Sequence, residues 1–213
     1  QYGPALAVGD MNGDGLDDVF ISGSYGYSGR MMLQTNNGRF IEKELFPGSD
    51  MNTKKNEDAG VLLFDADNDG DNDLYIAGGG FENDETSTNY IDRFYLNDGK
   101  GNFKPDSAAF PFSTISKSCV KAADYDKDGD LDLFVGGRVW RGKYPMPVSS
   151  FIFRNDSKPG LAHFSDVTKE IAPVLNNIGL VCDMLWTDFD NDGQIDILIG
   201  GEWMPLTFLK NTT

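Results

Sequence analysis

Asp65-Ala-Asp-Asn-Asp-Gly-Asp-Asn-Asp73 carries an acidic side chain at every odd position and a glycine at position 6. Residues 10–18, 124–132 and 188–196 follow the same nine-residue pattern. Side-chain oxygens at positions 1, 3, 5 and 9 converge on one point if the chain curls tightly at the glycine, which tolerates the backbone angles of such a curl. The sequence therefore predicts four copies of one metal-binding loop.

The predicted ligands are all oxygen atoms, from side chains and from the main-chain carbonyl at position 7. Such a set, without His or Cys, favours calcium, or less readily magnesium, over zinc or copper. We therefore expect about four Ca²⁺ ions. The predicted ligand residues are Asp10, Asn12, Asp14, Leu16, Asp18, Asp65, Asp67, Asp69, Asp71, Asp73, Asp124, Asp126, Asp128, Asp130, Asp132, Asp188, Asp190, Asp192, Gln194 and Asp196.

The residues after each loop separate this pattern from an EF-hand. An EF-hand loop closes with a Glu at position 12 and runs into a helix. Position 12 is instead Ile21, Ile76, Val135 or Ile199, each inside a short β-rich run that ends in glycine. Apolar runs also precede the loops, so each loop is expected to join two strands. A solvated acidic turn is the alternative, and four copies in one register disfavour it.

The loops recur through the whole chain, beginning at residues 10, 65, 124 and 188. Downstream of the first three lies a further strand-like run with a turn, such as Tyr95-Leu-Asn-Asp-Gly99. Four antiparallel strands per repeat would form one blade of a β-propeller. We expect an all-β fold in a single region, 1–213, with blades near 1–45, 58–106, 118–168 and 179–213, the last one incomplete. The best helical signal, 167–175, is interrupted by Pro173.

The loop followed by an apolar strand and Gly-Gly resembles the FG-GAP/VCBS-repeat β-propellers, whose members include the integrin alpha-subunit heads. Residues 136–147 and 186–205 are similar to the FG-GAP regions of bacterial ASPIC/UnbV-type surface proteins. The resemblance implies calcium on one propeller face and a protein or glycan partner on the opposite face. The incomplete last blade favours part of a larger propeller of about seven blades, whose remaining blades or a neighbouring subunit would be partners, over a closed ring of four.

The charge balance agrees with an extracytoplasmic calcium protein. The chain has 34 acidic and 18 basic residues, a formal net charge of −16, and the four loops hold over half of the acids. No basic stripe is available to neutralise phosphates, which argues against nucleic acid. The sequence shows neither a signal peptide nor an apolar span of about 20 residues. We expect an extracellular or cell-surface location, associated with a bacterial outer membrane, and an export signal upstream of this chain.

Candidate partner-binding residues lie in the loops after each Gly-Gly, on the face opposite the calcium loops. Aromatic residues with Arg are typical of interfaces and sugar sites. The residues are Tyr25, Tyr27, Phe81, Arg138, Trp140, Arg141 and Trp203. An equally weighted interpretation is that Trp140 and Trp203 only fill gaps between blades.

Catalytic signals are weak, because His163 is the only histidine and no Ser or Cys nucleophile motif lies near it. We therefore expect no catalytic residue and a calcium-stabilised binding or scaffold module, acting in adhesion, in glycan or protein capture, or in assembly with an outer-membrane complex. The alternative is part of a propeller-fold polysaccharide lyase or hydrolase whose catalytic residues lie outside this chain.

Two cysteines, Cys119 and Cys182, fall on equivalent first strands. A disulfide between them is conceivable, but their offsets from the following loop differ by one residue and alternate strand residues face opposite ways. Two unpaired, buried cysteines are the favoured interpretation.

Overall fold

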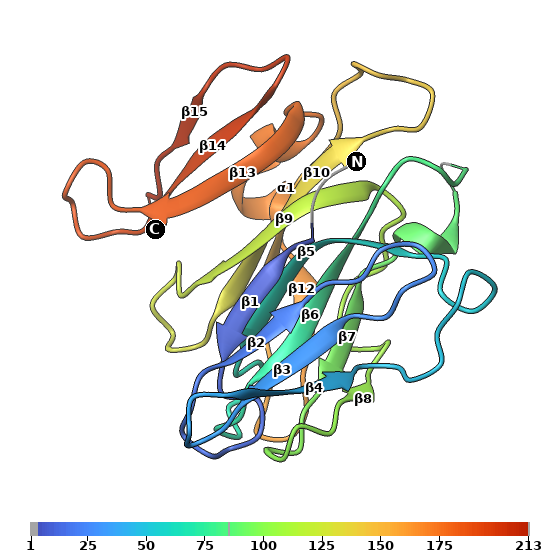
Figure 1. The fold of residues 1–213 in the computed structure, drawn as a ribbon. Helices are drawn as coiled ribbons and strands as arrows, with labels where there is room; N and C mark the ends of the chain where they lie inside the picture. The colour runs from blue at the N-terminus through green and yellow to red at the C-terminus, as the bar shows by residue number, and fades with distance from the viewer. Residues whose placement is uncertain (1–3, 85, 213) are drawn as a thin grey trace.

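The computed structural model describes residues 4–84 and 86–212, and it shows four antiparallel sheets in an all-β chain (Figure 1). Three sheets have four strands and the last has three. Residues 1–3, 85 and 213, which the sequence analysis assigned to the first, second and last blades, lie outside the described residues.

The strands follow one another along the chain in four groups. The first sheet consists of β1 (Leu6–Gly9), β2 (Asp18–Ile21), β3 (Arg30–Gln34) and β4 (Phe40–Glu44). The second consists of β5 (Glu57–Phe64), β6 (Asp73–Gly79), β7 (Arg93–Leu96) and β8 (Lys104–Pro105). The third consists of β9 (Ser116–Ala123), β10 (Asp132–Val139), β11 (Phe151–Asn155) and β12 (Phe164–Asp166). The fourth consists of β13 (Leu180–Thr187), β14 (Asp196–Glu202) and β15 (Thr207–Leu209).

Within each sheet, every strand pairs antiparallel with its neighbour in sequence. Each acidic loop connects the first strand of a sheet to the second, which confirms the predicted strand–loop–strand unit. The acidic loops therefore lie at one end of the sheets. The connections from second to third strands lie at the other end.

The first strands of consecutive sheets lie side by side, β1 against β5, β5 against β9 and β9 against β13 (Figure 1). Each pair of consecutive sheets encloses its own cluster of buried apolar residues. Between the second and third sheets, the Phe110 ring stacks on Phe164 with centroids 4.1 Å apart and meets Tyr75 edge-on at 4.8 Å. The core is therefore distributed between sheets, as in repeat proteins.

Helices are short. The expected segment contains α1 (Thr168–Ile171) and the 3₁₀ turn η2 (Pro173–Leu175), and a second 3₁₀ turn, η1, spans Thr88–Tyr90. No helix in the described ranges has the length and apolar character needed to cross a membrane.

A glycine five residues after the last loop position recurs in all four sheets, and the chain packs directly over it. A Cβ at Gly23, Gly78 or Gly137 would lie 2.2, 2.5 or 2.0 Å from the carbonyl oxygen of the returning segment. A Cβ at Gly201 would lie 2.4 Å from the Leu180 carbonyl oxygen. These distances leave no space for a side chain, which explains the repeated glycine.

The outward faces of the first and last sheets are apolar. In the last sheet, Leu185, Leu198 and Phe208 lie opposite one another across three strands. Leu185 is 57% exposed and Phe208 is 54% exposed. In the first sheet, Val8 lies opposite Val19, and Val8 is 61% exposed.

Cys119 in β9 and Cys182 in β13 lie on the first strands of adjacent sheets, as predicted. Both thiols are free. Cys119 is buried, in agreement with the favoured interpretation, but Cys182 is exposed, at the register shift between Val181 and Asp183.

Candidate metal centres

The first carboxylate of every loop holds the curl together. Its Oδ2 accepts a hydrogen bond from the backbone N–H of the glycine at position 6. The N–O distances are 2.8 Å at Gly15, 3.0 Å at Gly70, 3.1 Å at Gly129 and 2.9 Å at Gly193. The glycine itself has a positive φ, between 81° and 102°, as the sequence pattern predicts.

Position 4 also adopts the left-handed region in all four loops, which the sequence analysis missed. The φ angles are 74° at Gly13, 58° at Asn68, 62° at Lys127 and 59° at Asn191. Gly and Asn are the residues that enter this region most readily, so they are the signal that could have identified the position. Lys127 carries no such signal.

The aspartate at position 9 fastens each loop to the third strand of its sheet. In the second sheet, Asp73 Oδ2 accepts from the Ala66 N–H at 3.1 Å, and Asp73 Oδ1 accepts from the Asn97 N–H at 2.8 Å. Asp18, Asp132 and Asp196 make the same pair of bonds in the other sheets. These aspartates are at most 1% exposed. Position 9 therefore places one carboxylate at a fixed point behind each loop.

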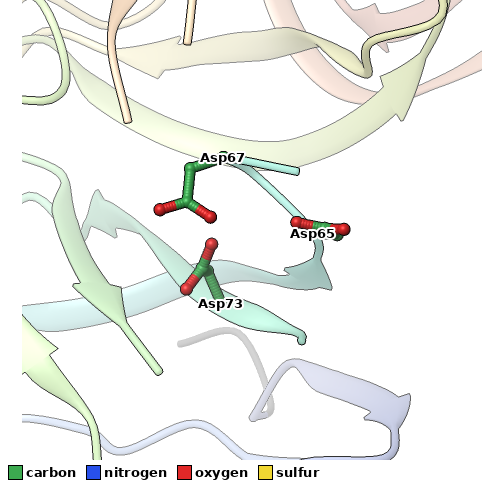
Figure 2. Close-up of side chains that lie close together, drawn as sticks. All are labelled: Asp65, Asp67 and Asp73. Atoms are coloured by element: carbon green, nitrogen blue, oxygen red, sulfur yellow. The ribbon is translucent and has the colours of Figure 1, made fainter. Parts of the chain in front are cut away.

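Three carboxylates converge in each of the last three loops, with oxygen atoms within 4.8 Å of one another. The groups are Asp65, Asp67 and Asp73; Asp124, Asp126 and Asp132; and Asp188, Asp190 and Asp196. Figure 2 shows the carboxylates of Asp67 and Asp73 pointing toward one another, with Asp65 to one side. The first loop has Asn12 at the equivalent of Asp67.

Asp67 offers the sharpest test of whether a cation fits. It is 2% exposed, yet its Oδ1 is buried without a hydrogen-bond partner. Burial, followed by the neighbouring Asp69 and Asp65, raises the pKa of Asp67. A buried, unsatisfied carboxylate oxygen beside other carboxylates is costly, and a divalent cation would satisfy it. The donor set therefore fits Ca²⁺.

The same electrostatic cost extends through the second and third loops. Burial raises the pKa of Asp73 and of Asp132 to about 7. Burial, with Asp69 next in size, raises the pKa of Asp71 to about 6. Each of these carboxylates resists ionisation while its charge is uncompensated, so a bound cation would stabilise the ionised loop.

The fourth loop differs from the others because a lysine reaches its carboxylates. Lys210 Nζ forms ion pairs with Asp190 and, at 2.9 Å, with Asp192 Oδ2. The hydrogen bond from Lys210 is the largest influence on the pKa of Asp192, and it lowers that pKa. Two predicted ligand positions of this loop are therefore already paired with a cation.

At the opposite end of the sheets, the predicted partner-binding residues are only partly brought together. Four of them, Phe81, Arg138, Trp140 and Arg141, line one cavity of about 340 Å³. Phe81 also lines an adjoining cavity of about 620 Å³ together with Tyr27. Tyr25 lines neither of these two cavities.

Trp203 stands at the edge of the first of these cavities. Its ring is 72% exposed, and its Nε1 donates to the Tyr144 hydroxyl at 2.6 Å. Tyr144 lines the cavity and donates to Glu202, which also pairs with Arg138 at 2.7 Å. The exposed ring of Trp203 does not fill a gap between sheets. The sequence analysis did not select Tyr144, because a lone tyrosine in a Pro-rich loop carries no positional signal.

Comparison with known proteins assigns the family. The FG-GAP-like repeat profile matches residues 10–76 and 65–135, so each match begins at an acidic loop and runs into the following repeat. The chain belongs to the FG-GAP-like repeat family. It is also 27% identical to cartilage acidic protein 1 of Mus musculus over 217 residues, covering 98% of this chain. This FG-GAP-repeat chain spans about 30% of the length of that relative.

Proposed function

We propose that this FG-GAP-repeat chain is a calcium-stabilised, non-catalytic binding or scaffold module. The observation that carries the proposal is the convergence of carboxylates in the acidic loops of the last three repeats, with a buried, unpartnered oxygen on Asp67. Side chains at positions 1, 3, 5 and 9 and the carbonyl at position 7 would hold the ion. Calcium there would neutralise the loop charge, and four ions would bring the net charge of −16 to about −8.

The four sheets are proposed to be blades of a β-propeller. Support comes from the adjacent first strands, the meander order within each sheet and the distributed core. The apolar outward rows at Leu185 and Val8 favour an arc of a larger ring of about seven blades, because such faces are normally covered. Further blades of the same kind, or a neighbouring subunit, would cover them.

The end opposite the acidic loops is the proposed partner surface. Its adjoining cavities are lined by exposed aromatic rings and by Arg side chains held in ion pairs, a composition that suits a protein or glycan partner. The family and the cartilage relative support the proposal of an extracellular or cell-surface location, and the likeness to bacterial surface proteins extends the proposal to an outer membrane. Millimolar calcium outside cells would keep weak loops loaded.

Thermal melting in calcium, in magnesium and in chelator tests the proposal. A single loaded site at a hundredfold excess over Kd contributes about 2.7 kcal/mol to folding stability. We expect melting to rise clearly in millimolar calcium and less in magnesium, which accepts only near-ideal octahedral sites. Equal melting temperatures in calcium and in chelator would contradict the proposal. Binding to arrayed glycans and matrix proteins, compared between the wild type and Trp140→Ala, then tests the partner surface.

A further inference from the structure

A continuous line of hydrogen bonds, buried at Asn97 and Asn155 and partly buried at Asn211, runs from each acidic loop to the next. The asparagine at the end of the third strand reaches back to the preceding sheet and donates its Nδ2 to the carbonyl at loop position 2. Asn97 donates to Met11 at 2.9 Å, Asn155 to Ala66 at 3.1 Å, and Asn211 to Tyr125 at 2.9 Å. These partners are 86 to 89 residues apart in sequence.

The same asparagines also hold the loop of their own sheet. The N–H of Asn97, Asn155 and Asn211 donates to the position-9 aspartate at 2.8 Å in each case. The other oxygen of that aspartate accepts from the N–H at position 2 of its loop. Each link therefore leads from one loop, through asparagine and aspartate, to the next loop.

We propose that Asn97, Asn155 and Asn211, here called the asparagine relay, are positioning residues that couple the metal loops of adjacent sheets. Position 2 lies between the proposed ligands at positions 1 and 3, so anchoring its carbonyl fixes both. The position-9 aspartate is itself a proposed ligand. Calcium at one loop thus preorganises its neighbours, and binding is cooperative along the chain. This inference rests on the proposed calcium function.

Burial makes the relay effective. Asn155 is 2% exposed and Ala66 is fully buried, so water cannot readily replace the bond between them. Asn37, in the turn after β3, provides a matched control. Its Oδ1 accepts hydrogen bonds only within its own exposed turn, from Thr35 Oγ1 and the Arg39 N–H.

The position-6 glycines allow each loop to be followed separately. Because each glycine N–H donates to the first carboxylate of its loop, its amide NMR resonance should respond to an ion at that loop. In a calcium titration of Asn155→Ala, we expect the midpoint reported by Gly70 to move to about fivefold higher calcium, because RT ln 5 is roughly 1 kcal/mol, the contribution of one hydrogen bond. The Gly15 midpoint should move less than the Gly70 midpoint, because Asn97 still links the first loop to the weakened second one. All midpoints should stay in place in Asn37→Ala.

A second variant distinguishes a local effect on one loop from a general loss of structure. Asn97→Ala removes the bonds to Met11 and to Asn72 in its own loop. It should therefore move the Gly15 midpoint more than Asn155→Ala does. An unchanged Gly70 midpoint in Asn155→Ala, or an equal shift at every loop, would overturn the relay. A wild-type protein whose glycine resonances ignore calcium would refute both the relay and the proposed function.

Coupling itself is measured by a double-mutant cycle. Asp67→Asn weakens the second loop and should, through the relay, also raise the midpoint reported by Gly129 in the third loop. In the Asn155→Ala background, the same substitution should leave the Gly129 midpoint unchanged. A Gly129 response of equal size in both backgrounds would show that the loops communicate without the relay and would overturn it.

Discussion

Replacing Asp67 by Asn should change folding stability in opposite directions with and without calcium. The carboxylate is buried, has an unpartnered Oδ1, and lies within 4.8 Å of two other carboxylates. Without calcium, the neighbouring carboxylates repel the negative charge of Asp67. With calcium bound, the same carboxylate would be one of its ligands. An amide of the same shape removes the repulsion but binds calcium less well.

The distance between the carboxylates sets the expected change in folding stability. Two unit charges 4.8 Å apart repel by about 1 kcal/mol in water and by about 3.5 kcal/mol at an effective dielectric of 20. Taking the lower value, Asp67→Asn should stabilise the calcium-free protein by about 1 kcal/mol. In calcium at a hundredfold excess over Kd, loss of the site removes up to about 2.7 kcal/mol. The variant should then be less stable than the wild type by roughly 1 to 2 kcal/mol.

Urea unfolding in chelator and in calcium measures both values. Asp71→Asn is the matched control, because Asp71 lies in the same loop and also has a raised pKa, but its predicted ligand is the main-chain carbonyl. This control should be stabilised in chelator and should still gain stability from calcium. If Asp67→Asn is more stable than the wild type in both conditions, Asp67 is not a calcium ligand and the argument fails.

Three further outcomes are expected. Lys210→Met should strengthen calcium binding at the fourth loop a few-fold, because the ammonium no longer competes for the carboxylates; a weaker site, followed at the Gly193 amide resonance, would show that the lysine supports binding. Trp203→Ala should lower partner affinity by about 1 to 3 kcal/mol with a melting shift near zero, since its ring is mostly exposed; a large melting loss would make the residue structural. A thiol reagent at pH 8 should label Cys182 in the native protein but not Cys119, because burial raises the pKa of Cys119 to about 11; equal labelling would contradict the described burial.

The sequence predicted the repeating unit well, because its determinants are local. Strand, acidic loop, strand and glycine follow from residues that lie within about 20 positions of one another. The interruption of the helical signal at Pro173 likewise agrees with the short helix α1 and the 3₁₀ turn η2. Convergence of the carboxylates in the last three loops required only the spacing and the glycine.

What the sequence did not predict depends on contacts between sheets. Asn97 lies in a predicted strand and turn, but its side chain reaches Met11 in the preceding sheet. Lys210 belongs to no motif in the sequence, yet it lies against the fourth loop. The gathering of Phe81 and Trp140 around one cavity, without Tyr25, also depends on how consecutive sheets pack. No single-repeat pattern contains this information.

Direct counting of bound calcium tests the central claim. Equilibrium dialysis with metal analysis should find four ions per chain, with Kd values of roughly 0.1 to 1 mM, the range of extracellular calcium modules. The site weakened by Lys210 should fill last. Two or fewer ions at saturating calcium would contradict the equivalence of the loops and, with it, the account of this chain as a calcium-stabilised repeat module.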